Sequence, residues 1–327
     1  MNSSAHHLLV LAWFCLIGLM LAFYVVTDGF DLGVGILSLF RRAESDRDVM
    51  LQSIGHVWDA NETWLVVLSG ALFGAFPTAY AMVLQDLYIP IMALIASLIM
   101  RGAAIEFRHA ATRKRAWDVI FGVGSLLAAI CQGIVLGKVI TGLAPGVLPG
   151  IFVVVTAIGV ASGYALLGST WLIRKTHGGL EQAARRSAIF TVFTTVAAAA
   201  VLSAGTMIFS SIGHGRWAQP GVFHVLCGFA FIAVLSFVYI VYAVVMGGER
   251  GPFRASVLLF LVSFAGLAIS LFPDIIPGRL SVADAASDSP TLVFMLFGIG
   301  TVFPVMIGYN LFQYYTFRGK VVAGSHD

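Results

Sequence analysis

The sequence predicts an all-α polytopic membrane protein with nine transmembrane helices. Of the 327 residues, 59% are hydrophobic and only 11% are charged, whereas roughly 25% of a typical soluble domain is charged. The mean hydropathy is +0.94. A spanning helix needs about 20 apolar residues, and segments of this kind follow one another along nearly the whole chain. They cover residues 7–38, 49–74, 78–107, 117–140, 149–173, 186–211, 221–246, 254–273 and 290–317.

The first apolar segment is expected to be a mature helix rather than a cleaved leader. It runs from Leu8 to Val26 and continues directly into residues 32–40, and no small-residue cleavage site follows a basic start. The chain shows no periodic repeat, no low-complexity tract and no long Gly/Ser linker. We therefore expect nearly all of it to lie in the bilayer.

The distribution of Lys and Arg predicts the orientation of the chain. Fifteen of the 19 basic residues lie in the loops after spans one, three, five and seven or in the C-terminal tail. Cytoplasmic loops are enriched in Lys and Arg, so the C-terminus is expected to be cytoplasmic and the N-terminus outside. The alternation supports an odd number of spans. The net charge of +3 then reflects topology rather than a nucleic-acid partner.

The three cysteines indicate no disulfide framework. Cys15, Cys131 and Cys227 each fall inside an apolar span, and none belongs to a CxxC pair. We expect them to be buried small hydrophobic residues.

Acidic residues in the first span form one candidate functional cluster. Asp28 and Asp31 are three residues apart in the string TDGFD, which places both carboxyl groups on one helix face. Two acids so close in a low-dielectric site compete for ionisation, so one of them could exchange a proton near neutral pH. The alternative is that the helix reaches the cytoplasmic interface here, because Arg41 and Arg42 follow within a few turns.

A second cluster opens the second span. His56, Asp59 and Glu62 recur every three residues, so we expect one titratable stripe suited to proton transfer through side chains and water. Trp58 and Trp64 fit an interfacial belt, although the apolar run after Trp64 places that residue deeper. The stripe is a poor metal site, because His56 lacks a second imidazole or thiolate nearby.

Arg101 ends an apolar run in the third span and requires a negatively charged partner. Glu106, five residues on, is out of register for pairing on the same helix. The counter-ion is therefore expected on another helix, with Asp28, Asp31 and Asp59 as candidates. Two further charges stand out in these segments: Asp86 within the third, and Lys138, which can snorkel to the outer interface.

Five of these segments resemble subunit II of the cytochrome bd family of quinol oxidases. They are residues 27–35 (TDGFDLGVG), 58–64 (WDANETW), 70–73 (GALF), 100–108 (MRGAAIEFR) and 271–273 (LFP). The order of the segments and the nine-helix count also agree. Two departures affect backbone packing rather than proton chemistry: Ala60 stands where the family usually has Gly, and Pro is often found near His56. The short chain is similar to the cyanide-insensitive branch of the family.

The resemblance implies a complex of the bacterial inner membrane that oxidises quinol and reduces dioxygen to water. In this family the b-type haems, haem d and the quinol site belong to the larger subunit I, so we expect no catalytic residue, haem or metal site in this chain alone. Only His56 and His224 fall within spans, and His224 is interpreted as a core histidine. A structural quinone and a small single-helix accessory subunit are further candidate components. Ubiquinol and menaquinol both remain open as the substrate.

The resemblance also implies roles for the polar residues. Oxygen reduction consumes protons, and a hydrated route from the cytoplasm is expected, with Asp31 and Glu106 nearest the cytoplasm, Asp59 deeper and Arg101 orienting the carboxylates. Trp64 matches a position near a dioxygen access route. The residues assigned to the proton path are Asp28, Asp31, Trp58, Asp59, Glu62, Arg101 and Glu106.

The family fold implies two four-helix bundles and one additional helix. The first bundle covers residues 1–145 and carries the polar clusters, and the second covers 146–327 with the ninth helix and a short tail. A proton-coupled transporter is the alternative function, with breaks near Pro77, Pro90 and Pro304 as gates. The acidic clusters have no inverted repeat in the second half, which disfavours that reading. A purely structural membrane subunit with ion-paired interfaces is the third possibility.

Overall fold

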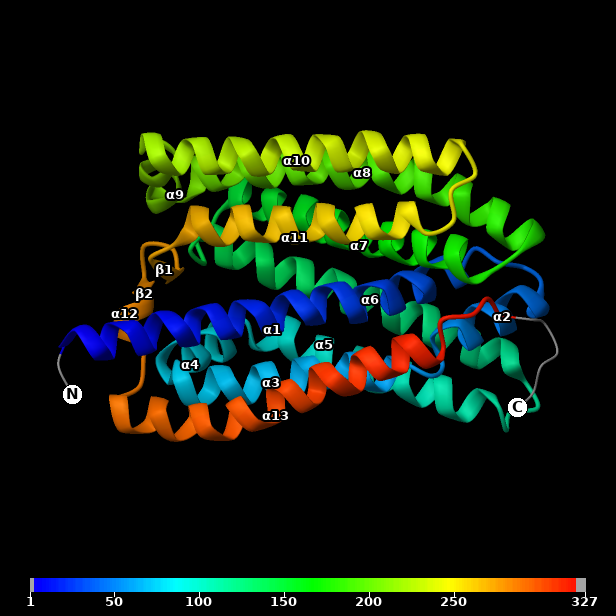
Figure 1. Ribbon diagram of the computed structural model, residues 1–327, viewed down its shortest axis with the longest axis horizontal. Coiled ribbons are helices and arrows are strands. Elements are labelled where there is room, and N and C mark those ends of the chain that lie inside the picture. The colour runs from blue at the N-terminus through cyan, green and yellow to red at the C-terminus, as the bar shows by residue number, and fades with distance from the viewer. Residues whose placement is uncertain (1–2, 322–327) are drawn as a thin grey trace.

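The computed structural model describes the backbone of residues 3–321 and, except at positions 3, 211 and 212, their side chains. Long helices lie side by side along the longest axis of the molecule (Figure 1). The helices are α1 (Ser3–Ser38), α2 (Glu44–Ile54), α3 (Trp58–Ala75), α4 (Pro77–Asp86), α5 (Tyr88–Arg108), α6 (Lys114–Ile140), α7 (Val147–Lys175), α8 (Gly178–Phe209), α9 (Ser211–Trp217), α10 (Pro220–Val245), α11 (Gly251–Leu271), α12 (Val282–Ala285) and α13 (Ser289–Thr316). Strands β1 (Asp274–Ile276) and β2 (Leu280–Ser281) form a small antiparallel pair.

The prediction of an all-α membrane protein is confirmed. Within the described residues, eight helices are long and apolar enough to cross a membrane, and the bent pair α3 and α4 gives a ninth span. Each of the nine predicted segments overlaps one of these helices. Helix α1 begins and helix α13 ends at opposite ends of the molecule, as an odd number of crossings requires (Figure 1).

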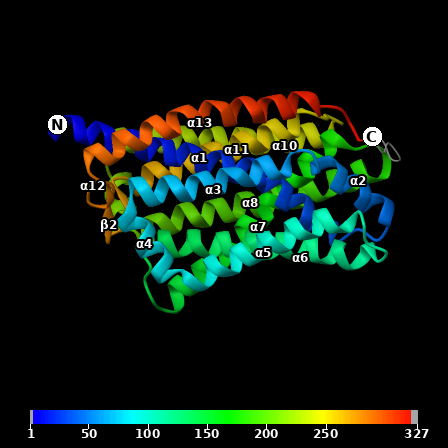
Figure 2. The same ribbon diagram turned by 90° about the horizontal axis from the view of Figure 1, so that it is seen from below.

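Two predicted spans differ from the structure. The second, 49–74, is divided into α2 and α3 by a turn at residues 55–57, because α2 is a short, charged helix that lies at one end of the bundle (Figure 2). The third, 78–107, is divided into α4 and α5. Pro77 opens α4, which bends by 117° from α3. Hydropathy alone does not detect these breaks, because the apolar composition continues through them.

The two ends of the molecule differ in charge. The end that carries α2, the loops at 109–113 and 246–250 and the segment 317–321 is here called the basic end, because the basic loops gather there. The opposite end carries α4, β1, β2 and α12 (Figures 1 and 2). The loop between α6 and α7, where the predicted bundle boundary near residue 145 falls, is also at this opposite end.

The core is assembled around α1, which packs against α3, α6 and α7. One buried cluster includes Phe30 stacked on Trp171 of α7, with ring centroids 4.3 Å apart. A second cluster, towards the opposite end, surrounds Trp13 and Trp64. The acidic residues of α1 lie among its buried positions, so the packing that buries α1 also removes these carboxyl groups from solvent and lipid.

The prediction for the cysteines is wrong at two of three positions. Cys131 is buried, but Cys15 and Cys227 are exposed on the helix surfaces. A membrane protein presents an apolar surface to lipid, so an apolar segment does not distinguish core positions from lipid-facing ones.

Candidate functional site

Arg101 is the centre of a buried ionic cluster formed by three helices. Its Nη1 donates to Oδ1 of Asp28 on α1 at 2.5 Å, and its Nη2 donates to Oε2 of Glu62 on α3 at 3.0 Å. The side chains of Arg101 and Asp28 are fully buried, and that of Glu62 is 26% exposed. The expected counter-ion on another helix is therefore Asp28, and Glu62 is a second one.

Asp31 lies beside this cluster and is held by a different partner. Nδ2 of Asn61 on α3 donates to Oδ2 of Asp31 at 2.8 Å and to the carbonyl oxygen of Thr27 at 3.3 Å. The hydroxyl group of Tyr314 on α13 donates to Oδ1 of Asn61 at 2.7 Å. Both ends of the Asn61 amide are thus used. Tyr314 was not expected in the site, because its sequence position gives no sign that α13 packs against α3.

The cluster contains more acid than base. Asp28, Asp31 and Glu62 carry three carboxyl groups, whereas Arg101 supplies one guanidinium group. Among the described residues, no hydrogen-bond partner is found for three buried polar atoms of the cluster: Oδ2 of Asp28, Oδ1 of Asp31 and Nε of Arg101. Buried polar atoms are normally paired, so this site has capacity to bind protons or water.

The structure places Asp59 and Glu106 outside the buried cluster. Both are exposed, Asp59 in the first turn of α3 and Glu106 in the last turn of α5 at the basic end. The expected order of depth is wrong for Asp59, because Asn61, which bonds to Asp31, is farther along α3. The expected stripe is also interrupted: His56 lies in the preceding turn and stacks on Phe317, with ring centroids 4.2 Å apart.

Trp58 and Trp64 have different surroundings. Trp58 is half-buried next to Gly102 of α5, where an added Cβ would lie 3.5 Å from its ring. Trp64 is fully buried and stacks on Phe23 of α1 at 4.7 Å between ring centroids, with Phe303 of α13 edge-on at 5.6 Å. As expected from the apolar run that follows it, Trp64 lies deeper than Trp58.

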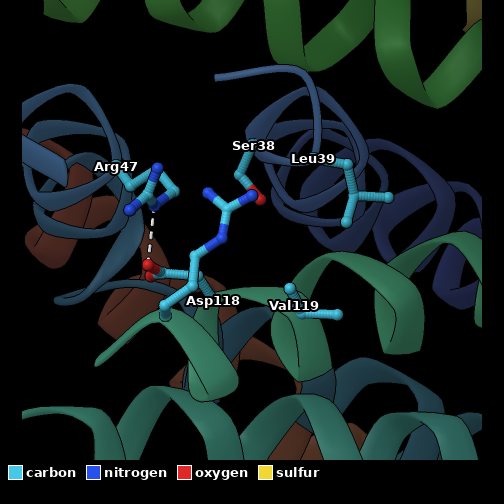
Figure 3. A pocket seen from close by; sticks show the side chains of 6 residues that line it. Ser38, Leu39, Arg47, Asp118 and Val119 are labelled. Atoms are coloured by element: carbon cyan, nitrogen blue, oxygen red, sulfur yellow. Dashed lines mark hydrogen bonds and ion pairs between the residues drawn. The ribbon is translucent and has the colours of Figure 1, made fainter. Parts of the chain in front are cut away.

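A second buried ionic network lies at the basic end, and the sequence analysis missed it. Asp118 of α6 accepts from Nε of Arg47 at 2.6 Å (Figure 3). It also accepts from Nε of Arg108 at 2.6 Å. Arg108 also donates to Asp48 of α2 at 2.6 Å. In the sequence Arg47 and Arg108 count only among the basic residues that indicate topology, because loop charges near a membrane surface are usually solvated. A cavity of about 20 Å³ lies beside Arg47 and Asp118, which is room for roughly one water molecule.

A third polar group connects α1 with α6 and α7. Nε2 of Gln132 donates to the hydroxyl oxygen of Tyr24 at 2.8 Å, and the hydroxyl group of Tyr164 donates to Oε1 of Gln132 at 2.5 Å. Tyr24 is one helical turn from Asp28. The sequence gives no sign of this group, because an uncharged polar side chain in an apolar segment does not require a charged partner.

The remaining singled-out residues lie at the surface. His224 is exposed on α10, with Nδ1 2.5 Å from the carbonyl oxygen of Pro220, so it is not a core residue as expected. Asp86 pairs with Arg279 at 3.2 Å at the opposite end. Lys138 lines a cleft of about 340 Å³ beside that pair, consistent with the expected snorkelling to an interface.

Comparisons with known proteins agree with the motif resemblance. The family model "Cytochrome bd terminal oxidase subunit II" matches residues 9–317. "Cytochrome bd ubiquinol oxidase subunit 2" of Bacillus subtilis (strain 168) is 28% identical over 335 residues, which cover 94% of this chain and 96% of the relative. "Cytochrome bd-I ubiquinol oxidase subunit 2" of Escherichia coli (strain K12) is 25% identical over 359 residues, with 94% of each chain covered.

The fold is also similar to that of a solved structure. A chain of "The structure of bd oxidase from Geobacillus thermodenitrificans" superposes with a TM-score of 0.77 at 16% identity, covering 94% of this chain and 98% of that chain. These findings do not favour the transporter alternative. This chain therefore belongs to the cytochrome bd terminal oxidase subunit II family and is a subunit of a quinol oxidase.

Proposed function

We propose that this chain supports a haem-bearing subunit I and lines a path that carries protons to the oxygen-reducing centre. The observation that carries the proposal is the buried cluster of Asp28, Glu62 and Arg101, with Asp31 beside it. Ionised groups at membrane depth are costly and are usually kept for ion or proton transfer. The cluster joins α1, α3 and α5, which are distant in sequence.

The charge balance of the cluster suits reversible proton binding. One guanidinium group cannot neutralise three carboxylates, and an uncompensated buried charge costs several kcal/mol. Uptake of a proton by a carboxyl group offsets this excess, and its release to the next acceptor restores it. Arg101 fixes the position of Asp28 and Glu62 in both states.

The exposure of the acids gives the path a direction. Asp59 and Glu106 are exposed at the basic end, whereas Glu62 is 26% exposed and Asp28 is fully buried. We assign Asp59 and Glu106 to proton uptake, with Trp58 between their helices, and Glu62 to the step from the surface into the cluster. Asp28 and Asp31 are the innermost acceptors.

We assign the basic end to the cytoplasm. The excess of Lys and Arg in its loops supports this orientation, which places the C-terminus in the cytoplasm and the N-terminus outside. The family membership supports a location in the bacterial inner membrane. In this orientation the exposed acids take up protons from the cytoplasm.

We assign the b-type haems, haem d and the quinol site to subunit I. The haems supply electron transfer and dioxygen reduction when bound there. Membership of the subunit II family supports this assignment. A structural quinone and a single-helix accessory subunit are additional components that we propose from family membership.

Trp64 is proposed to border a route for dioxygen. It lies in a fully apolar, aromatic environment with Phe23 and Phe303, and dioxygen is a small apolar molecule that partitions into such surroundings. Glu62 and Trp64 are two residues apart on α3, so their side chains point to different sides of the helix. Protons and dioxygen would therefore approach along different faces of α3.

The proposal is tested by neutralising path residues in the purified oxidase complex. Glu62→Gln and Asp28→Asn are compared with Asp86→Asn, which removes a carboxylate of an exposed pair at the opposite end. We expect quinol-driven oxygen consumption to fall by roughly 100-fold in the first two variants, the low end of what a positioned proton donor or acceptor contributes. The visible haem spectrum should be unchanged.

Two outcomes would contradict the proposal. If Glu62→Gln and Asp28→Asn consume oxygen at the rate of Asp86→Asn, the cluster does not carry limiting protons. If the haem content falls in parallel with the activity, the cluster has a structural role, and the chain fits the ion-paired structural subunit instead.

A further inference from the structure

We infer that Tyr314 of α13 is a positioning residue that orients Asp31 through the side-chain amide of Asn61. This inference rests on the proposed proton path and adds the ninth spanning helix to it. Its basis is a chain of two hydrogen bonds from Tyr314 to Asn61 and from Asn61 to Asp31, at 2.7 and 2.8 Å.

The hydroxyl group of Tyr314 completes the set of partners that fixes which way the amide faces. A side-chain amide has an acceptor end and a donor end, and its orientation follows from its partners. The carbonyl oxygen of Thr27 can only accept, so the Nδ2 end faces α1, where it donates to Thr27 and to Asp31, and the hydroxyl group of Tyr314 holds the other end by donating to Oδ1. In this orientation Asp31 accepts a hydrogen bond from Nδ2 of Asn61. With the amide reversed, Asp31 would face Oδ1, which is an acceptor.

The position of Tyr314 is itself fixed by packing. Its ring lies edge-on to Phe30 of α1 and to Trp171 of α7, with ring centroids 6.3 Å apart in each case. Asn61 is fully buried, so its amide is shielded from bulk solvent. The three aromatic rings and Asn61 connect α13 to α1, α3 and α7 at the level of Asp31.

The arrangement explains a feature of α13 that lipid contact does not. Most of this helix is exposed, with Leu292 and Asn310 as its only buried residues within the described part of the chain. The hydroxyl group of Tyr314 nevertheless points inward to Asn61, whereas the adjacent Tyr315 is 67% exposed. A residue that served only to anchor α13 in the membrane would not need this contact.

The test uses a matched pair of tyrosine variants in the complete oxidase complex. Tyr314→Phe removes the hydroxyl group from Asn61 and keeps the ring. Tyr315→Phe removes an exposed hydroxyl group for which no hydrogen bond to the described residues is found. We expect oxygen consumption to fall by roughly fivefold in Tyr314→Phe, the effect of losing about one hydrogen bond, and to be unchanged in Tyr315→Phe.

The infrared spectrum gives a readout that a general packing defect would not mimic. The carboxyl band that disappears in Asp31→Asn is assigned to Asp31. We expect this band to shift in Tyr314→Phe and to remain in place in Tyr315→Phe, with the haem spectrum unchanged in both. Combining Tyr314→Phe with Asp31→Asn should lower the activity no further than Asp31→Asn alone.

The results separate this inference from the proton path. If Asp31→Asn leaves oxygen consumption unchanged, Asp31 is not part of the path and the proposed function fails at this residue. If Asp31→Asn lowers oxygen consumption but the Asp31 band does not move in Tyr314→Phe, the proton path stands and Tyr314 does not position Asp31. Equal band shifts in Tyr314→Phe and Tyr315→Phe would also overturn the inference.

Discussion

The backbones of Gly33 on α1 and Gly168 on α7 are in direct contact. A Cβ atom on Gly33 would lie 1.8 Å from the carbonyl oxygen of Tyr164, and one on Gly168 would lie 2.4 Å from the carbonyl carbon of Gly33. Close helix crossings in membranes depend on small residues in this way. The crossing holds α1, and with it Asp28 and Asp31, against the second half of the chain.

We predict that Gly33→Ala destabilises the protein by about 1–3 kcal/mol or more, because the clash is with backbone that has no rotamer to adopt. Thermal unfolding of the purified complex measures the effect as a lower Tm. Gly18→Ala is the matched control on the same helix, since an added Cβ there meets nothing within 4 Å. Equal Tm values for the two variants would show that the α1–α7 crossing is not this tight.

Replacing Arg101 is expected to lower the free energy of unfolding more than replacing an exposed arginine. Arg101→Met leaves the fully buried Asp28 without its partner, and breaking such a pair costs about 3–5 kcal/mol. Arg279→Met breaks the exposed pair with Asp86, which is worth about 0–1 kcal/mol. Chemical denaturation of both variants measures the difference. Similar losses would mean that Asp28 is neutral or solvated.

Much of the fold could be predicted from the sequence, because nine apolar segments of sufficient length leave few alternatives. The helix α2 was hidden because its buried residues Met50, Leu51 and Ile54 extend the apolar run of the next span. The bend at Pro77 was hidden in the same way. Composition identifies which residues lie at membrane depth but not where a helix turns back.

The site could be predicted only in part. Asp28 and Arg101 stand out because a charge in an apolar segment needs a partner, but the sequence leaves Asp28, Asp31 and Asp59 open as the counter-ion of Arg101. Asn61 belongs to the segment WDANETW, but its bond to Tyr314 depends on how α13 packs, 253 residues away in the sequence. Asp118 was overlooked because it lies among basic residues at a span boundary, where charges are usually solvated.

The second ionic network predicts a stability defect that is separate from proton transfer. Asp118→Asn leaves Arg47 and Arg108, whose side chains are 5% and 4% exposed, without their shared carboxylate. We expect a loss of about 3–5 kcal/mol, measured as reduced yield and Tm of the complex. The fraction that assembles should consume oxygen at the normal rate per haem.

The control for this prediction is Glu44→Gln, which removes an exposed partner of Lys114 at the same end and should change stability by less than about 1 kcal/mol. A normal Tm for Asp118→Asn would argue that the network is hydrated. A lower rate per haem would argue that Asp118 belongs to the proton path.

The last residues of the described chain are fastened to the basic end, and one of the contacts is predicted to depend on pH. Nζ of Lys320 donates to Glu249 at 2.9 Å, and the amide of Val321 donates to the carbonyl oxygen of Lys175 at 2.9 Å. The hydrogen bond and charge of Lys320 hold the pKa of the Glu249 carboxyl group below its usual value of 4.5.

A carboxyl group with a lower pKa in the folded state stabilises that state above its usual pKa, and the contribution is lost as the pH falls through the folded value. The segment 317–321 should therefore be attached at neutral pH and loosen only below about pH 4.5. Hydrogen–deuterium exchange at the Val321 amide measures this. In Glu249→Gln the Val321 amide should exchange faster than in the wild type at neutral pH and equally fast in acid. In the control Asp284→Asn, at the opposite end, this amide should exchange as in the wild type. The same exchange rate in Glu249→Gln and the wild type at neutral pH would show that this ion pair does not hold the tail, leaving the bonds to Lys175 and the ion pair of Lys320 with Glu181, at 3.5 Å, as its attachment.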